Sequence, residues 1–373
     1  VTGVQTCALP ISISQKAKDI REIALNAEKI HNHIKWYFFT ILPELKRISD
    51  TSYKGNAFKD KQWFEAQQAV IQTLKMGSHF TGQWPHGSFV MAGGVTCDPL
   101  KSDIISALGC LDAVIAFCEE HFYGMHLEEF LSFDSALQVM SAPSALSYGI
   151  DEMIKYGFDR LGRSFDRFLA LGESYRYEGS LKAAKTTVLG ADLKYVHEST
   201  EHTFFEDKHK GYTYSKSAMY RRNYCEVGPL ARMMVSKDAL MRDFHRRFKD
   251  AALTRVVARA VECAHLLLRT KTLLAQLNLK EPSLILPKRD IYSLSGEGIG
   301  VIEAPRGSLI HYVVAQQGVI ESYDIITPTV WNLGNGDKEN PSTAQKAIIG
   351  LNSFTKADFI LKSFDVCSVC TTQ

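Results

Sequence analysis

The chain has 373 residues, of which 45% are hydrophobic and 10% aromatic, a composition typical of a globular protein with a substantial core and not of a disordered one. Its 43 basic and 41 acidic residues leave a formal charge of +2, so overall charge does not favour nucleic acid or an anionic membrane as a partner. No apolar run approaches the roughly 20 residues that cross a bilayer, and the N-terminus lacks a charged-then-apolar secretory signal, so we expect a cytoplasmic protein that meets membranes only through partners.

The first twelve residues, VTGVQTCALPIS, resemble the translation of a synthetic sequencing-library adapter. We therefore expect residues 1–12 to be an artefact and residues 13–373 to form one domain. The chain would then begin inside its gene, and its true N-terminus would be missing.

Helical patterns dominate the first third of the chain. Apolar residues recur in steps of three and four from Ile20 onwards, which predicts a helix that ends at Pro43. A second helix is expected over residues 59–76, followed by a structured loop rich in Gly and Pro. Asp98 should then cap a helix that starts with Pro99 and runs to about residue 120.

The remaining sequence changes character twice. Residues 125–215 carry short runs and several glycines, which indicate irregular structure with small strands, and residues 236–279 predict one or two long core helices. After Pro287, β-branched runs separated by glycine-containing turns predict a small antiparallel sheet, followed by helices near residues 342–351 and 355–363. The predicted fold is mainly α, with a large helical-bundle core and a small antiparallel β-sheet.

The chain ends in DVCSVCTTQ, where Cys367 and Cys370 form the one compact pair among eight cysteines. A C-x-x-C pair can be a redox dithiol, half of a zinc site or half of another thiolate metal site. The redox form relies on a helix that begins at the cysteines, and here the sequence stops three residues later. A zinc site needs two more ligands, and the nearest candidates, His31 and His33, diverge on a helix. The sequence therefore favours half of a thiolate metal site whose other ligands lie elsewhere.

Four blocks of the sequence resemble motifs of the nickel-iron hydrogenase large subunit. Residues 30–38 read IHNHIKWYF, similar to the helical H-D-H-x-x-x-F-Y motif, and residues 224–233 contain E-V-G-P-L-A-R. Residues 297–312 contain G-x-x-E-A-P-R-G, and residues 363–373 are similar to D-P-C-x-x-C-x-x-H. The order and wide spacing of the blocks make the resemblance specific, and it extends over about residues 13–373.

The resemblance implies nickel bound by four cysteine thiolates, two of which bridge to an iron that carries carbon monoxide and cyanide. Cys367 would be a terminal nickel ligand and Cys370 a bridging ligand, because soft thiolates suit both metals. The other two thiolates would come from an upstream C-x-x-C that this sequence does not contain. This chain alone is therefore expected to be inactive.

The resemblance also implies roles for residues around the metals. Arg306 would stand over the open metal position, where its guanidinium polarises dihydrogen or assists the departing proton, and Pro305 would shape the same canopy. Asp365 would pair with Arg306 or relay protons. Thr329 would donate a hydrogen bond to an iron-bound cyanide, and the backbone of Ala304 and Arg306 would hold the other cyanide.

Other polar residues of these blocks are expected to be structural. We expect Glu226 and Arg232 to form an ion pair that supports the fold. The same expectation, a satisfied core or supporting histidine and not a metal ligand, applies to His31, His33, His86 and His311.

Three residues depart from the family pattern. Asn32 stands where many members have Asp, which removes an ionisable group near the canopy, and Val366 replaces a proline. Gln373 replaces a histidine that ligates magnesium, and an amide oxygen coordinates a hard cation more weakly. The sequence also stops at Gln373 without the extension that a maturation protease removes from most members, which favours a regulatory, hydrogen-sensing subgroup. A mature chain or an interrupted sequence would end in the same way, and the resemblance also includes a cyanobacterial-type uptake subgroup.

The implied function is the reversible reaction H2 ⇌ 2H+ + 2e−. The sequence contains no iron-sulfur cluster motif, so electrons would leave through the clusters of a small partner subunit. Maturation proteins would be further partners, and no nucleic acid or membrane span is expected. The rival interpretation is a non-catalytic scaffold like the quinone-side subunit of respiratory complex I, which shares the fold but has lost the metal cysteines.

Overall fold

The structure, a computed structural model, describes residues 13–49, 61–85, 87–171, 192–202, 205–206, 211–212, 216–286 and 293–367. The adapter-like residues 1–12, His86, Cys370 and Gln373 lie outside the described residues.

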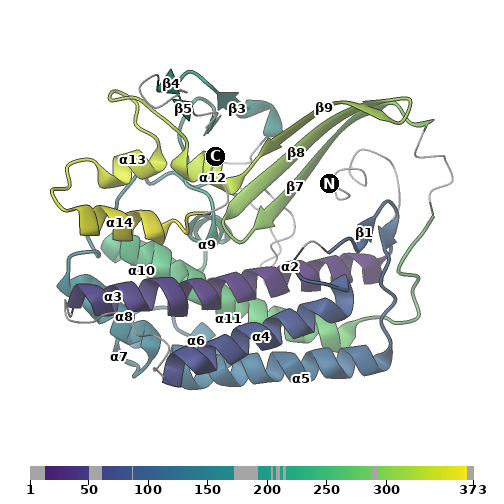
Figure 1. Ribbon diagram of the computed structural model, residues 1–373. Helices are drawn as coiled ribbons and strands as arrows, with labels where there is room; N and C mark the ends of the chain where they lie inside the picture. The colour runs from purple at the N-terminus through teal and green to yellow at the C-terminus, as the bar shows by residue number, and fades with distance from the viewer. Residues whose placement is uncertain are drawn as a thin grey trace.

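Long helices pack against one another as a bundle (Figure 1). They are α2 (Gln15–Trp36), α4 (Lys61–Thr81), α5 (Lys101–Phe117) and, behind the others in the view of Figure 1, α11 (Ala252–Gln276). α11 is the central helix, because every residue from Ala252 to Ala264 is buried. No described helix combines the length and the apolar character that crossing a membrane requires.

The first helix does not end at Pro43. The chain continues through a π-helical turn, η1 (Tyr37–Ile41), into α3 (Leu42–Ser49). In this turn the Leu42 N–H donates to the carbonyl of Tyr37, five residues back, immediately before a proline that has no N–H to donate. The wider turn accommodates the proline inside a continuous helix, so the predicted helix end was wrong.

The predicted N-cap at Asp98 was also wrong. α5 is capped at Leu100, whose N–H donates to the carboxylate of Asp103 at 2.8 Å. Asp98 instead forms an ion pair with Lys16 of α2 and accepts a hydrogen bond of 2.7 Å from Ser283. Asp98 therefore ties the start of α2 to the loop that follows α11, a tertiary role that local sequence does not reveal.

The loop predicted between the second and third helices is shorter than expected. α4 continues to its end at Thr81, and the loop holds a small hairpin of β1 (Val90–Met91) and β2 (Gly94–Val95). α5 runs on into a second π-helical turn, η3 (Cys118–Tyr123).

Residues 125–155 are helical, so the prediction of irregular structure was wrong there. They form α6 (Leu127–Leu131), α7 (Ala136–Ser141) and α8 (Ala145–Lys155). The oxygen of Ser144 accepts the N–H of Ser147 at 3.1 Å, an N-cap signal that the short apolar runs concealed. The small strands expected further on are confirmed as β3 (Val196–Ser199), β4 (Phe205–Glu206), β5 (Gly211–Tyr212) and β6 (Ser217–Tyr220), preceded by the single turn η4 (Leu193–Tyr195).

The helices predicted after residue 236 and the sheet are confirmed. These helices are α10 (Ala239–Phe248), α13 (Thr343–Ile348) and α14 (Phe354–Ser363), together with α11. Two short helices that start at a proline, α9 (Pro229–Ser236) and α12 (Pro328–Leu333), were not predicted. β7 (Gly296–Ala304), β8 (Gly307–Gln316) and β9 (Val319–Ile326) form an antiparallel sheet in that order, set above the long helices (Figure 1).

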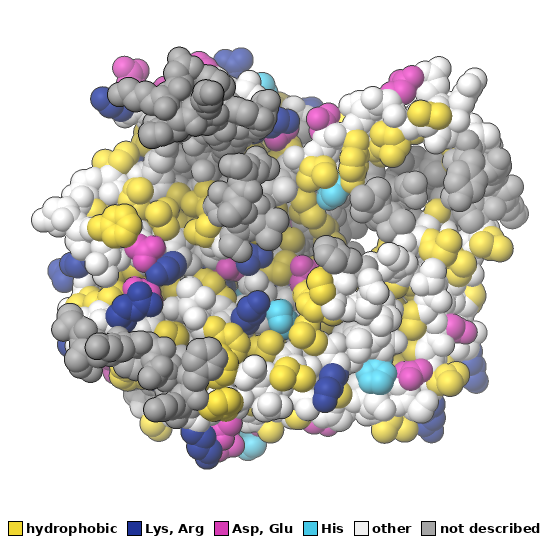
Figure 2. All heavy atoms as spheres, viewed as in Figure 1, with side chains coloured by type: hydrophobic (Ala, Val, Ile, Leu, Met, Phe, Trp, Pro, Cys, Tyr) yellow, Lys and Arg dark blue, Asp and Glu magenta, His cyan; other side chains and the backbone are white. Residues whose placement is uncertain are grey.

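The sheet has an inner end, at the turn between β7 and β8, and an outer end, at the turn between β8 and β9, and the two have different surroundings. At the inner end, Ile310 packs with Val227 and Trp331 in a second, smaller core. Toward the outer end hydrophobic side chains remain on the surface (Figure 2), and Val319 and Ile320 are 67% and 54% exposed. The inner end of the sheet, where β7 turns into β8, therefore contacts the rest of the fold.

The turn between β7 and β8 packs tightly against the segment that starts α9. A Cβ atom on Gly307 would lie 2.4 Å from Cγ2 of Val227 and 2.8 Å from the nitrogen of Gly228. A Cβ atom on Gly228 would lie 2.8 Å from the carbonyl oxygen of Arg306. Glycine at both positions allows two backbones to approach more closely than side chains would permit.

Two of the described histidines of the motif blocks are hydrogen-bonded, in agreement with the expected supporting role, whereas the third packs against an aromatic ring. His33 is buried on α2, with Nε2 2.7 Å from Oε2 of Glu262. His311 is half-buried on β8, with Nδ1 2.5 Å from the hydroxyl of Tyr323. His31 is half-buried against Trp84, and burial, with a smaller contribution from Lys35, lowers its pKa to about 4.

Acid should destabilise the protein partly through His31. Its pKa is about 4 in the folded state and 6.5 when unperturbed, so its contribution to stability is present above pH 6.5 and is lost as pH falls toward 4. Between pH 7 and pH 5, the free energy of unfolding from urea denaturation should fall about 1–2 kcal/mol less in His31→Asn than in the wild type. An equal fall in both proteins would contradict this assignment.

Gly307→Ala should be markedly more destabilising than Gly296→Ala. Both glycines lie in the β7–β8 hairpin with positive φ, +139° and +154°, but an added Cβ at Gly296 meets nothing within 4 Å. We expect urea denaturation to show losses of about 2–4 kcal/mol for Gly307→Ala and about 1 kcal/mol for Gly296→Ala. Similar losses would show that the close approach to Val227 and Gly228 contributes little to the free energy of unfolding.

Candidate functional site

Arg306, Asp365 and Asn32, which are far apart in sequence, meet beside the turn between β7 and β8. Nε of Arg306 donates to the backbone carbonyl of Asp365 at 2.9 Å, and Nη2 lies 3.3 Å from Oδ1 of the same residue. Asn32 of α2 donates from Nδ2 to the other carboxylate oxygen at 2.7 Å. The Asp365 side chain is 5% exposed and that of Arg306 31%, so the ion pair sits at the boundary between core and solvent.

Asp365 turns the chain where α14 ends. Its φ is +61°, a left-handed conformation that costs a non-glycine residue roughly 1–2 kcal/mol. Its N–H donates to the carbonyl of Lys362 at 2.9 Å, and its carboxylate is held by Arg306 and Asn32. These contacts stabilise the turn, and Cys367 follows two residues later, half-buried.

Side chains from the helices hold the backbone that leads to Cys367. Nε1 of Trp36 donates to the carbonyl of Lys362 at 3.0 Å, and Nη1 of Arg259 donates to the carbonyl of Ser363 at 2.9 Å. The Arg259 guanidinium also lies 4.4 Å from the centre of the Trp36 ring. Together with the Arg306 bond, three elements fix the position of this segment: α2, α11 and the β7–β8 turn.

The ion pair expected between Glu226 and Arg232 is not formed. Arg255 of α11 donates to Glu226 through Nε and Nη2, both at 2.8 Å, whereas Nε of Arg232 donates to Glu262 at 2.6 Å. Gly228, with φ +114°, turns the chain between Glu226 and Arg232, and the two side chains reach residues of α11 about two helical turns apart. Each residue is structural, as expected, but the predicted pairing was wrong.

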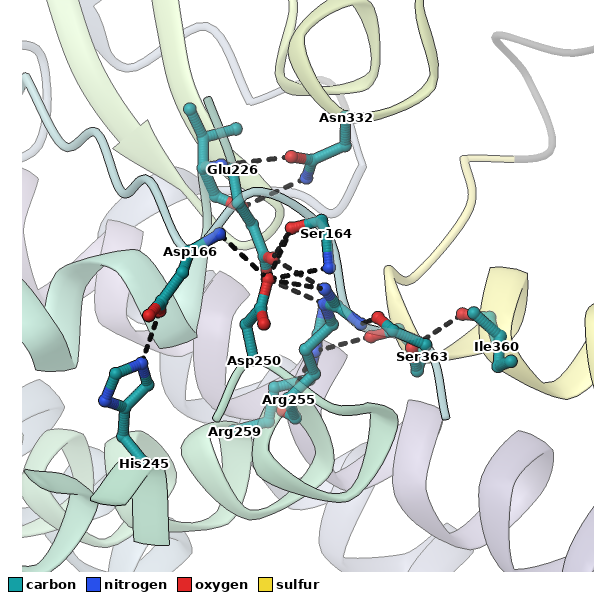
Figure 3. A network of polar contacts seen from close by, with 12 residues as sticks. Ser164, Asp166, Glu226, His245, Asp250, Arg255, Arg259, Asn332, Ile360 and Ser363 are labelled. Atoms are coloured by element: carbon teal, nitrogen blue, oxygen red, sulfur yellow. Dashed lines mark hydrogen bonds and ion pairs between the residues drawn. The ribbon is translucent and has the colours of Figure 1, made fainter. Parts of the chain in front are cut away.

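Figure 3 shows how Glu226 joins a wider polar network. Asp250 accepts hydrogen bonds from the hydroxyl of Ser164 at 2.6 Å and from its N–H at 2.7 Å, and Asp166 forms an ion pair with His245. The segment that follows α8 is thereby fastened to α10 and to the residues between α10 and α11.

Asn332 connects α12 to the same region. Its Oδ1 accepts the N–H of Val227 and its Nδ2 donates to the carbonyl of Val227, each at 3.0 Å (Figure 3). Thr329 is half-buried in the first turn of α12. The helix that carries Thr329 is therefore tied to the segment that packs on the Arg306 turn.

Burial shifts the pKa values of several ionisable groups near this site. It lowers the pKa of Arg259 to about 10 and that of Lys29 to about 8, and it raises the pKa of Glu28. Burial alone would also raise the pKa of Glu262, but Arg232 and His33 together hold that pKa well below the usual range. Burial therefore disfavours the charged forms of Lys29, Arg259 and Glu28, whereas its partners keep Glu262 ionised.

The predicted site residues fall into two groups. Arg306 and Asp365 are in contact, with Pro305 buried and Ala304 half-buried in the same turn, and Cys367 close in sequence. Cys370 and Gln373 lie outside the described residues. The catalytic and ligand roles of all these residues stay predictions.

Sequence reasoning missed the supporting residues on α11. Arg255, Arg259 and Glu262 follow a spacing of four and three, which places them on one face of an otherwise apolar helix. Charged side chains on a buried helix need partners, so this spacing could have indicated that the three residues bind groups of other elements.

Of the predicted thiolate pair the structure describes Cys367, and Asp365, which binds Arg306, lies two residues before it. Within the described ranges, no three His, Cys, Asp or Glu side chains gather in an arrangement that could hold a metal ion. A cysteine thiolate is a suitable ligand for a soft metal, but it would need further ligands to form a site.

Comparison with known proteins identifies the family of this sequence. The family model described as nickel-dependent hydrogenase matches residues 176–373. The "Periplasmic [NiFeSe] hydrogenase large subunit" of Desulfomicrobium baculatum is 28% identical, in an alignment that covers 93% of this chain and 75% of that protein. The "NAD-reducing hydrogenase HoxS subunit beta" of Cupriavidus necator is 24% identical, with coverage of 97% and 77%.

Solved structures share the fold. The Ni-Fe-Se hydrogenase from D. vulgaris Hildenborough in the reduced state superposes with a TM-score of 0.79 at 21% identity, covering 100% of this chain and 85% of that chain. A reduced, active form of the Ni-Fe-Se hydrogenase from Desulfomicrobium baculatum gives 0.76 at 20% identity, with coverage of 100% and 86%. Because the family model matches more than half of the sequence, the chain belongs to the nickel-dependent hydrogenase family.

Proposed function

We propose that this chain is the catalytic large subunit of a nickel-iron hydrogenase and takes part in the reaction H2 ⇌ 2H+ + 2e−. The observation that supports this most strongly is the ion pair of Arg306 with Asp365, two residues before Cys367. It joins an arginine of the A-P-R-G block to the cysteine block, as a hydrogenase site requires. The proposal includes both hydrogen uptake and hydrogen sensing, because both roles use the same cleavage of dihydrogen.

Cys367 and Cys370 would hold the nickel-iron centre together with further thiolates, the iron carrying carbon monoxide and cyanide. When bound, this centre supplies the Lewis-acid and redox chemistry that cleaves dihydrogen. Thr329 and the backbone of Ala304 and Arg306 are the proposed donors to cyanide. Gln373 would offer an amide oxygen to magnesium.

The side chains around the centre would position and move the proton. Arg306 is fixed at two points by the carbonyl and the carboxylate of Asp365, yet 31% of its side chain remains exposed. Its guanidinium can therefore present N–H groups in a defined direction while staying in contact with solvent. Asn32 contributes a neutral amide, so Asp365 is the single carboxylate of this trio and balances the charge of Arg306.

Electrons would leave through an iron-sulfur small subunit, because this sequence contains no cluster motif. Maturation proteins are proposed as further partners. We propose a cytoplasmic location, consistent with Cys97, Cys110, Cys118, Cys225 and Cys263, which are thiols and not disulfides in the structure.

Nickel content of the full-length complex tests the proposed function. Cys367→Ser and Cys370→Ser should each lower bound nickel at least about tenfold in elemental analysis, because each removes a soft thiolate ligand. Cys110→Ser, a half-buried position on α5, is the matched control and should leave the nickel content unchanged. Normal nickel in Cys370→Ser would show that the ligand is misassigned, and a wild-type complex without nickel would favour the scaffold interpretation.

A further inference from the structure

Arg232 is a fully buried arginine whose five N–H groups all have acceptors. Nε and Nη2 donate to the two carboxylate oxygens of Glu262 at 2.6 and 2.7 Å. Nη1 donates to Glu303 and to the carbonyl of Ala304, both at 3.1 Å. Nη2 also donates to the carbonyl of Pro305 at 3.2 Å. One side chain thus connects α11 to the two backbone carbonyls that immediately precede Arg306.

Glu262 determines where this arginine lies. It is 0% exposed and accepts both donors of Arg232 on one edge, and Oε2 also lies 2.7 Å from Nε2 of His33. A bidentate pairing fixes the plane of the guanidinium as well as its position. The remaining donors of Arg232 are therefore aimed at the β7–β8 turn in one orientation.

The turn has little freedom once these carbonyls are bound. Arg232 holds the carbonyls of Ala304 and Pro305, and the carbonyl of Arg306 packs against Gly228. On the next strand, the hydroxyl of Ser308 donates to Glu303. Only the side chain of Arg306 projects from the turn toward Asp365.

We propose that Glu262 is a positioning residue for Arg306: through Arg232 it fixes the turn from which the Arg306 guanidinium reaches Asp365. The relevance of this device to hydrogen cleavage rests on the proposed function. A buried ion pair is often no more stabilising than apolar side chains of the same volume, whereas its bidentate geometry specifies one arrangement. In this protein the specified arrangement is the β7–β8 turn held at the carbonyls of Ala304 and Pro305 by Arg232.

The Glu22–Arg269 pair provides the control. It is also a bidentate Glu–Arg pair that involves α11, with bonds at 2.8 and 3.1 Å, but it joins α11 to α2 about two helical turns beyond Glu262. Glu22→Gln and Glu262→Gln each remove one carboxylate charge opposite an arginine. A general loss of stability should affect both variants alike.

The test is hydrogen-deuterium exchange of the backbone amides in residues 304–308, where Pro305 has none, in the full-length complex, with nickel content and hydrogen turnover measured on the same samples. Glu262→Gln should raise exchange in this segment at least about tenfold and lower turnover by a similar factor at unchanged nickel content. Glu22→Gln should leave both within about twofold of the wild type. Equal effects in the two variants, or unchanged exchange in Glu262→Gln, would overturn the proposal.

Arg232→Lys keeps the test informative if Glu262→Gln does not fold. A lysine preserves the positive charge beside Glu262, but it has no planar fork to hold two carboxylates and two carbonyls together. It should raise exchange in residues 304–308 as Glu262→Gln does, and unchanged exchange would reject the role of the pair. Exchange that responds as expected in a complex without nickel or turnover would support the positioning role while contradicting the proposed function.

Discussion

The burial of three charged side chains in the central helix α11 is the constraint on which the rest of the structure depends. Arg255, Arg259 and Glu262 are almost completely removed from water, and an unpaired charge in such a place costs several kcal/mol. Each must therefore bind a group of another element. The partners are Glu226, the carbonyl of Ser363, and Arg232. The position of α11 thus dictates where these elements lie.

Two of these connections reach the residues on either side of the contact between Arg306 and Asp365. From Glu262 the contacts run through Arg232 to the turn that carries Arg306, and from Arg259 they run through Ser363 to the segment that carries Asp365. The two series of contacts are joined by the bonds between Arg306 and Asp365. An exposed ion pair of this kind would be worth little on its own. Here both partners are already held by the core, so little conformational entropy is lost when they meet.

Patterns that depend on neighbouring residues could be predicted from the sequence. The sheet of β7, β8 and β9, the long helices after residue 236 and the last two helices follow from periodicity and turn residues. The choice of partners could not be predicted, because it depends on tertiary contacts. Asp98 binds Lys16 instead of capping α5, and Glu226 binds Arg255 instead of Arg232.

The most direct test is hydrogen turnover by the Arg306→Lys variant of the full-length complex, with Arg269→Lys as the control. A lysine ammonium cannot reproduce the planar contact with both the carbonyl and the carboxylate of Asp365. Arg269 makes a comparable fork to Glu22, at 2.8 and 3.1 Å, between α11 and α2. We predict wild-type nickel content in both variants and a loss of turnover of about a hundredfold or more in Arg306→Lys alone. Unchanged turnover in Arg306→Lys would contradict the catalytic role of this arginine.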